Sequence, residues 1–321
     1  MRTADEISVD VLVDNTADML STRPAYFTPE LRVLMDAGMK EMAGESLSIA
    51  QHGICLAVTA HIEGETRTVL FDAGPDPYTL ERNARQTGFD FGNVDALVLS
   101  HGHFDHSEGL LKAAELIRRR NAGSPIPLHV HPGAFVKRAD RLSDGSILPL
   151  QDVPAPDELE RAGLTIAYSA GPEEILGGAF YLSGEIPRRS FERGLENQVR
   201  LRDTGEWEPD PLVIEERFMA AIIKGKGIAI FTGCSHAGIV NICTHSRELF
   251  PDVPLYALAG GLHLVYPNEE FIGDTVAALK NFGFKLIIPG HCTGWRAVHA
   301  LINAFGDEVV NPLAVGSRLT F

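Results

Sequence analysis

A cluster of metal-binding side chains follows one apolar segment of the sequence. Residues 94–100 (VDALVLS) are typical of a buried strand and run directly into the motif His101-Gly102-His103-Phe104-Asp105-His106. In an extended chain, residues two apart point the same way, so His101 and His103 are predicted to bind one ion while Asp105 and His106 face a neighbouring point. Because four potential ligands fall within six residues, the motif predicts two adjacent metal positions. Imidazole and carboxylate donors suit Zn²⁺, with Mn²⁺ or Fe²⁺ as alternatives.

The sequence lacks the usual motifs for other kinds of catalysis. It has no G-x-S-x-G nucleophile elbow, no G-x-x-x-x-G-K-[ST] phosphate loop and no G-x-G-x-x-G fingerprint. The chemistry is therefore expected from a hydroxide that a divalent ion generates near neutral pH. Asp105 is the candidate to hold the attacking water and to move its proton.

The surrounding pattern predicts the elements that position this cluster. Short β-branched segments alternate with amphipathic ones, and a helix over 108–120 has an apolar stripe of Leu110, Ala113, Ala114 and Ile117. No linker or internal repeat interrupts the order, so we predict one α/β sandwich domain over 1–321. The polar, turn-rich stretch around 134–210 is predicted to be an irregular insertion or lid.

Composition excludes several classes of protein. Lys+Arg 28 against Asp+Glu 43 gives a net charge of −15, which disfavours nucleic acid as a partner. No apolar run of 18 residues is present, so we expect no membrane partner. The acidic N-terminus does not resemble a secretory signal, and the 4 cysteines form no C-x-x-C pair, so a cytoplasmic location is expected. We expect a small-molecule substrate, and a homodimer on general grounds alone.

Further motifs extend the pattern along the chain and resemble a known superfamily. The motif at 101–106, the turn Leu70-Phe71-Asp72-Ala73-Gly74 and the segments 231–236 (FTGCSH) and 288–291 (IPGH) resemble the metallo-β-lactamase superfamily. That resemblance implies an αβ/βα four-layer sandwich with a dinuclear site at the edge of its two sheets. The segments GCSHAGIVN, AGGLHL and PGHCTG are similar to a subgroup of dihydropterin-type synthases (7,8-dihydropterin-6-methyl-4-(β-D-ribofuranosyl)aminobenzene 5′-phosphate synthases) of the methanopterin pathway.

The resemblance also implies a ligand set. One metal would take His101 and His103, and the other Asp105, His106 and His291. The third histidine of the first metal normally lies between the cluster and the bridging aspartate, but no histidine occurs between His131 and His236. His236 is favoured for that place, with Glu185 as the alternative.

Cys234 is a second departure from the superfamily pattern. It stands where the superfamily has its bridging aspartate, and it is either a thiolate ligand or a small buried residue. Loss of the carboxylate bridge leaves mononuclear occupancy open.

Four further residues have expected roles near the metal. The resemblance implies that Asp72 accepts a hydrogen bond from a ligand side chain and orients it, and a simple turn aspartate is the competing account. His263 is expected to face substrate, to support a ligand or to be a ligand itself, and a capped core histidine is the competing account. Arg188 and Arg189 either clamp an anionic group of the substrate or form a solvated basic patch.

The sequence predicts a metal-dependent hydrolase acting on a small anionic or cyclic substrate, such as a phosphoester, a cyclic phosphodiester, a lactone or a pterin-like compound. Two alternatives remain. One is the dihydropterin-type synthase that the subgroup implies, and the other is a non-catalytic ligand sensor.

Overall fold

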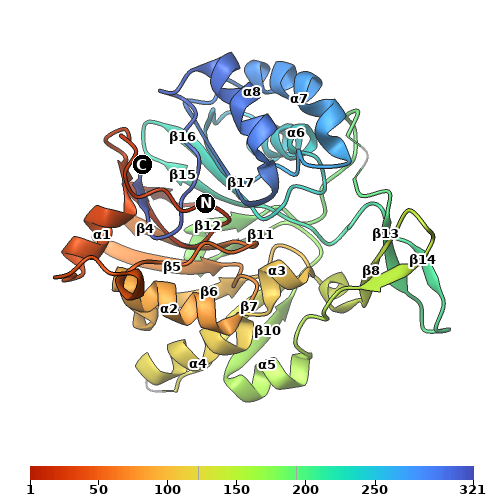
Figure 1. Ribbon diagram of the computed structural model, residues 1–321, viewed down its shortest axis with the longest axis horizontal. Helices are drawn as coiled ribbons and strands as arrows, with labels where there is room; N and C mark the ends of the chain where they lie inside the picture. The colour runs from red at the N-terminus through yellow and green to blue at the C-terminus, as the bar shows by residue number, and fades with distance from the viewer. Residues whose placement is uncertain (122, 193) are drawn as a thin grey trace.

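Two β-sheets lie face to face, and helices cover the outer face of each (Figure 1). The structure is a computed structural model, and it describes residues 1–121, 123–192 and 194–321. Among these residues, no helix is long and apolar enough to cross a membrane.

The first sheet has eight strands, most of them from the N-terminal half of the chain. Its parallel pair of β5 and β6 leads to the predicted ligand cluster. In spatial order the strands are β10 (Leu164–Tyr168), β7 (Ile126–Val130), β6 (Val94–Val98), β5 (Glu65–Phe71), β4 (Cys55–Ile62), β2 (Glu6–Val13), β19 (Arg318–Thr320) and β3 (Phe27–Thr28).

The second sheet has seven strands and contains most of the C-terminal half. Its strands β15 and β16 form a hairpin, pairing antiparallel across the turn Lys224-Gly225-Lys226. The order is β11 (Glu173–Ile175), β12 (Phe180–Leu182), β15 (Met219–Ile223), β16 (Gly227–Thr232), β17 (Leu255–Gly261) and β18 (Leu286–Gly290), with β1 (Thr3–Ala4) beside β15.

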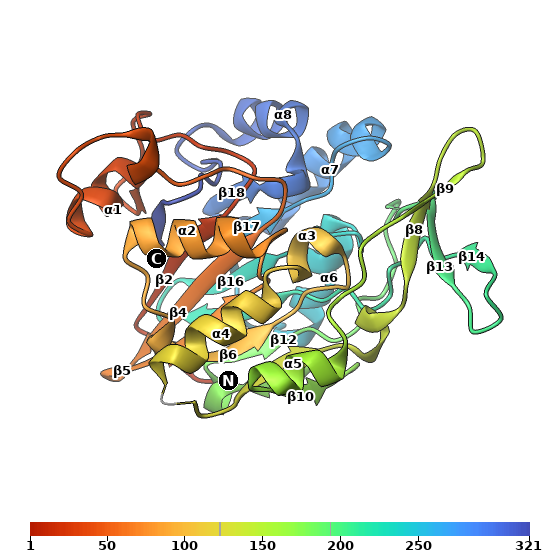
Figure 2. The ribbon, with the colours of Figure 1, turned by 60° about the horizontal axis from the view of Figure 1, so that its bottom comes forward.

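The helices divide between the two outer faces (Figures 1 and 2). The eight-stranded sheet is covered by α2 (Pro77–Thr87), α4 (Leu110–Arg120) and α5 (Pro156–Ala162), and the seven-stranded sheet by α6 (Ile239–Leu249), α7 (Ile272–Leu279) and α8 (Trp295–Phe305). Two short helices, α1 (Glu30–Asp36) and α3 (Phe104–Ser107), complete the set.

Three apolar cores hold the four layers together. One lies between the sheets and includes Phe71, Phe180 and Phe231, all fully buried. The other two lie between each sheet and its helices. The predicted stripe of α4 is confirmed, because its buried residues are Leu110, Ala113, Ala114 and Ile117. Burial of such a stripe contributes most of the stability of a surface helix.

The segment 134–210 is more regular than the sequence predicts. Four of its short strands form a separate antiparallel sheet that stands out from the body beside the site, shown in Figure 2: β14 (Trp207–Pro209), β13 (Gln198–Leu201), β8 (Arg138–Arg141) and β9 (Ile147–Pro149). Strands of three or four residues carry too few alternations for a local pattern to reveal them. Pairing of β8 with β13, about 60 residues later, is decided by tertiary contacts.

Candidate metal centre

Five loops bring the predicted ligands to one edge of the two sheets. Strands β5 and β6 run parallel, as do β16, β17 and β18, so within each set the carboxyl ends meet at the same edge. The side chains that follow these ends are Asp72 after β5, His101 after β6, Cys234 and His236 after β16, His263 after β17 and His291 after β18.

The first donor group consists of three buried histidines, His101, His103 and His236, together with Cys234. His101 Nε2 lies 3.1 Å from His103 Nδ1 and 3.1 Å from His236 Nε2. The His101 and His236 nitrogens and the Cys234 sulfur all lie within 4.8 Å of one another. The structure therefore brings His236 beside His101, where the superfamily pattern calls for the third histidine of the first metal.

The second donor group consists of Asp105, His106, Cys234 and His291. Cys234 Sγ lies 3.2 Å from both His106 Nε2 and His291 Nε2. Asp105 Oδ2 lies 3.3 Å from His291 Nε2 and 3.7 Å from His106 Nε2. Cys234 thus belongs to both groups.

Hydrogen bonds behind the rings turn unprotonated nitrogens toward the centre. Asp72 Oδ2 accepts from His106 Nδ1 at 2.7 Å and from Ser100 Oγ at 2.8 Å. Because Ser100 donates to Asp72, its oxygen is free to accept the Nδ1 proton of His101 at 2.9 Å. His291 Nδ1 lies 3.1 Å from Asn15 Oδ1. With these protons directed outward, the Nε2 atoms of His101, His106 and His291 carry lone pairs.

This donor set fits a divalent cation. Lone pairs that converge at about 3 Å repel one another unless a positive charge lies between them, and neutral imidazole, thiolate and carboxylate are zinc ligands. Two ring nitrogens here, His103 Nε2 and His236 Nδ1, are buried without a hydrogen-bond partner among the described residues. Burial lowers the pKa of His103 to about 3 and that of His101 and His236 well below the usual range, which keeps all three neutral.

In the second group, the surroundings raise the pKa values of His106 and Cys234 and lower that of Asp105. Burial alone would lower the pKa of His106, but the Asp105 and Asp72 carboxylates raise it to about 9. Without a cation the His106 ring therefore also carries a proton on Nε2 at neutral pH, and a bound cation would displace that proton. Burial alone would raise the pKa of Asp105, but His106, His291 and His52 hold it well below its usual range. Asp105 is therefore a carboxylate at neutral pH. Burial raises the pKa of the Cys234 thiol, so a cation is needed to stabilise its thiolate.

Three of the predicted residues lie away from the donor groups. Glu185 accepts from His131 Nε2 at 3.2 Å and its side chain is half-exposed. Arg188 donates to the carbonyls of Ile186 and Leu212, and Arg189 forms a surface ion pair with Glu248. The structure gives none of the three a place at the centre.

His263 lies beside the first group. Its ring centroid is 4.4 Å from that of His236. His263 shares a left-handed backbone conformation with three other residues of the centre, with φ of 59° at Asp72, 72° at Ser235, 44° at His263 and 46° at His291. Such strain in residues other than glycine tends to collect at functional sites.

Several supporting residues were missed by sequence reasoning. Glu216 accepts from the backbone N–H of His236 at 2.8 Å and of Ala237 at 2.6 Å, which fixes the loop that carries His236. Its neighbours Glu215 and Arg217 are also buried. The available signal was that these three consecutive charged residues directly precede the apolar segment 218–223 (FMAAII).

His52 and Asn15 were also missed. His52 Nε2 lies 3.3 Å from Asp105 Oδ2, and its side chain is 62% exposed. Asn15 holds His291 through both ends of its amide, since its Nδ2 also donates to the His291 carbonyl at 3.1 Å. Neither residue had a nearby ligand in the sequence to mark it.

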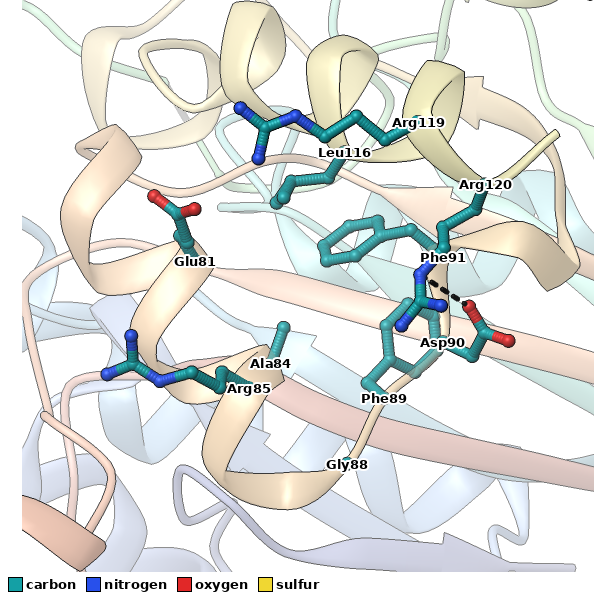
Figure 3. A pocket seen from close by; sticks show the side chains of 10 residues that line it. All are labelled: Glu81, Ala84, Arg85, Gly88, Phe89, Asp90, Phe91, Leu116, Arg119 and Arg120. Atoms are coloured by element: carbon teal, nitrogen blue, oxygen red, sulfur yellow. Dashed lines mark ion pairs between the residues drawn. The ribbon is translucent and has the colours of Figure 1, made fainter. Parts of the chain in front are cut away.

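A cavity of about 230 Å³ opens onto the donor groups. Asp140, Asn197 and Gln198 line it from the separate sheet and its approach, and Tyr266 and Phe104 add aromatic walls. No lysine or arginine is among its described lining residues, so an anionic substrate would depend on the cation itself. A larger cavity between α2 and α4 is lined by Arg85, Arg119 and Arg120 but by none of the donors (Figure 3).

Asp72→Asn is expected to weaken metal binding about 10- to 100-fold, because the single amide oxygen cannot accept both from the Ser100 backbone N–H, as Asp72 Oδ1 does, and from His106 Nδ1, as Oδ2 does. Asparagine tolerates the left-handed backbone at this position, so the loop itself is preserved. Titration in metal-buffered solutions measures the affinity, with Asp144→Asn in an exposed turn as the control. Unchanged affinity in Asp72→Asn would exclude the orienting role.

The metal-free protein is expected to lose stability as the pH falls below about 6.5. Below that pH, His103 becomes protonated in the unfolded chain but stays neutral in the folded chain, where its pKa is about 3. The stability contributed by the neutral His103 ring is therefore fully present above pH 6.5. Below it, each histidine with a similarly lowered pKa reduces the unfolding free energy by up to about 1.4 kcal/mol per pH unit. Urea unfolding between pH 7 and pH 5 measures the slope. His103→Gln should make it shallower, and an equal slope in the variant would contradict this account.

The fold and the arrangement of donors define a metallo-β-lactamase-type protein, with candidate metal-binding groups where the two sheets meet. A model of the β-lactamase superfamily domain matches residues 67–158, which include the motif at 101–106. The crystal structure of a metal-dependent hydrolase of the β-lactamase superfamily superposes with a TM-score of 0.69 at 23% identity, covering 98% of both chains.

Two proteins of Methanocaldococcus jannaschii are similar over most of their length. One is an uncharacterised protein, 33% identical over 258 residues, which are 78% of this chain and 88% of that protein. The other is named 7,8-dihydropterin-6-methyl-4-(β-D-ribofuranosyl)-aminobenzene-5′-phosphate synthase and is 28% identical over 262 residues, 81% of this chain and 86% of its own. The chain belongs to the metallo-β-lactamase superfamily, and both the predicted fold and the predicted resemblance are confirmed.

Proposed function

We propose that this protein is a metal-dependent hydrolase that acts on a small anionic or cyclic molecule: a phosphoester, a cyclic phosphodiester, a lactone or a pterin-like compound. The observation that carries the proposal is the pair of donor groups that share Cys234 at the floor of the cavity. Zn²⁺ is the ion that best suits imidazole, carboxylate and thiolate donors together, and Mn²⁺ and Fe²⁺ are alternatives.

A bound divalent cation would supply two things, a water acidified to a pKa of about 7 and polarisation of the scissile carbonyl or phosphoryl oxygen. The protein's own residues hold and move the proton. Asp105 is ionised, so its carboxylate accepts the proton of the attacking water, and His52 lies 3.3 Å from Asp105 Oδ2. Because most of the His52 side chain is exposed, it can pass the proton to solvent.

Chelation tests the proposal directly. Hydrolysis of bis-p-nitrophenyl phosphate, a cyclic nucleotide and an acyl lactone is measured before chelator treatment, after it, and after Zn²⁺ or Mn²⁺ is returned. We expect activity on one class to disappear and to be restored. Activity that survives complete removal of metal would contradict the proposal.

A second candidate is a dihydropterin-type synthase, which the similarity to the named synthase favours. Incubation with a dihydropterin alcohol pyrophosphate and an aminobenzoate-type acceptor separates the two functions, because a coupled product forms only with a synthase. Saturable binding of a ligand without any turnover would instead support a sensor.

We also propose a cytoplasmic location. All four cysteines are free and buried, as expected for a chain that folds in a reducing compartment.

A further inference from the structure

Two side chains beside the centre, a half-buried histidine and a buried cysteine, belong to neither of the donor groups described above. His263 follows β17, and Cys292 follows His291 in the turn after β18. One donor atom from each, together with the Cys234 sulfur, lies within 4.8 Å of the other two. A third donor group, Cys234–His263–Cys292, therefore adjoins the first two.

His263 is the least satisfied residue of this group. Both of its ring nitrogens are buried, and neither has a hydrogen-bond partner among the described residues. A buried imidazole of this kind loses its contact with water and gains nothing in exchange, unless something binds it. Its φ of 44° adds backbone strain at the same residue. The orphaned ring and the strain together indicate a missing partner.

The backbone beside it is shaped to admit the Cys292 sulfur. A Cβ atom at Gly261 would lie 2.7 Å from Cys292 Sγ and 2.3 Å from the Gly233 carbonyl oxygen. Only a residue without a side chain lets the end of β17 approach both groups so closely. Gly261 thus permits Cys292 to stand beside Cys234 and His263.

Ordinary thiol packing explains only part of this arrangement. Cys292 Sγ lies 3.3 Å from the Cys234 carbonyl oxygen and can donate to it as a thiol. That hydrogen bond accounts for the position of Cys292, but it leaves both nitrogens of His263 without a partner. A cation among the three donors would bind one nitrogen of His263 together with the two sulfurs.

We propose that Cys234, His263 and Cys292 form a further cation position, of the Cys₂His type, for a thiophilic divalent ion such as Zn²⁺. Three protein ligands with a fourth place open is the pattern of catalytic rather than structural zinc. His263 and Cys292 both line the cavity, so the open place faces incoming substrate. The proposal rests on the proposed function only through Cys234, which this position shares with the other two.

Cobalt titration tests the position without depending on activity. Metal-free protein is loaded with Co²⁺, and the thiolate-to-cobalt absorption per chain is measured along with bound metal. In Cys292→Ser we expect this absorption to fall about twofold, because one of two thiolate ligands is lost. His263→Gln should lower the affinity of the weakest-bound ion, and Cys243→Ser, buried in α6, serves as the matched control that changes nothing.

The outcomes separate this position from the main centre. If Cys292→Ser and His263→Gln both keep the wild-type absorption and metal content, the position does not exist, even where His103→Ala loses metal and the proposed hydrolase stands. A Cys234–Cys292 disulfide that persists under reductant in the presence of metal would also overturn it. Thermal unfolding of each metal-free variant checks folding, and His263→Gln alone decides the question if Cys292→Ser fails to fold.

Discussion

His103→Ala is expected to lower kcat/KM for the hydrolysed substrate at least about 10³-fold, or about 4 kcal/mol of transition-state stabilisation. The reason is that His103 Nδ1 lies 3.1 Å from His101 Nε2 and is one of three neutral imidazoles around the same point. Steady-state kinetics and elemental analysis of the purified variant measure activity and metal content together.

The stability of the metal-free variant should not fall along with its activity. In the metal-free protein, His103 Nε2 is buried without a partner among the described residues, so its removal should leave stability unchanged or raised. His299→Ala, at an exposed position of α8, is the control and should alter neither property. A His103→Ala protein that keeps its metal and its activity would remove His103 from the centre.

Cys234→Ala is expected to have the next largest effect, because Cys234 belongs to both donor groups. Bound metal should fall below the wild-type value, and kcat/KM should fall about 10²- to 10³-fold, comparable to the loss of one strong electrostatic group. Metal content under matched free-ion concentrations and kinetics on the same preparation measure the two effects.

Cys234→Asp makes the comparison sharper. This variant restores the carboxylate that the superfamily pattern places there, so it should retain more metal than Cys234→Ala. Cys243→Ser controls for loss of a buried thiol elsewhere. If Cys234→Ala binds as much metal as the wild type, Cys234 is a packing residue and the two groups do not share a ligand.

The strongest sequence predictions were those with a local signal. The apolar stripe of α4 is visible as apolar residues three to four positions apart within one short segment. The motif at 101–106 places four candidate ligands beside one strand end. Both depend on residues close together in the chain. The four-stranded sheet over 134–210 had no such signal, because its strands are short and its pairings are long-range.

The separation of supporting residues along the chain explains what was missed. Asn15 and His291 are 276 residues apart, and Glu216 reaches a loop 20 residues away. A hydrogen bond between such residues leaves no periodicity and no fixed spacing in a single sequence. Glu185 and His236 were alternatives for the same reason, and the structure sets Glu185 against His131 while bringing His236 to His101.

The sequence by itself determined the kinds of donor and the strands that carry them, because residue type and hydrophobic period are properties of short segments. Only the tertiary structure decided which donors meet, which nitrogen of each ring faces inward, and that Cys234 is common to three groups. These outcomes depend on how two sheets pack and on hydrogen bonds between distant loops. Such contacts form only when the whole chain has folded, since no local segment contains both partners.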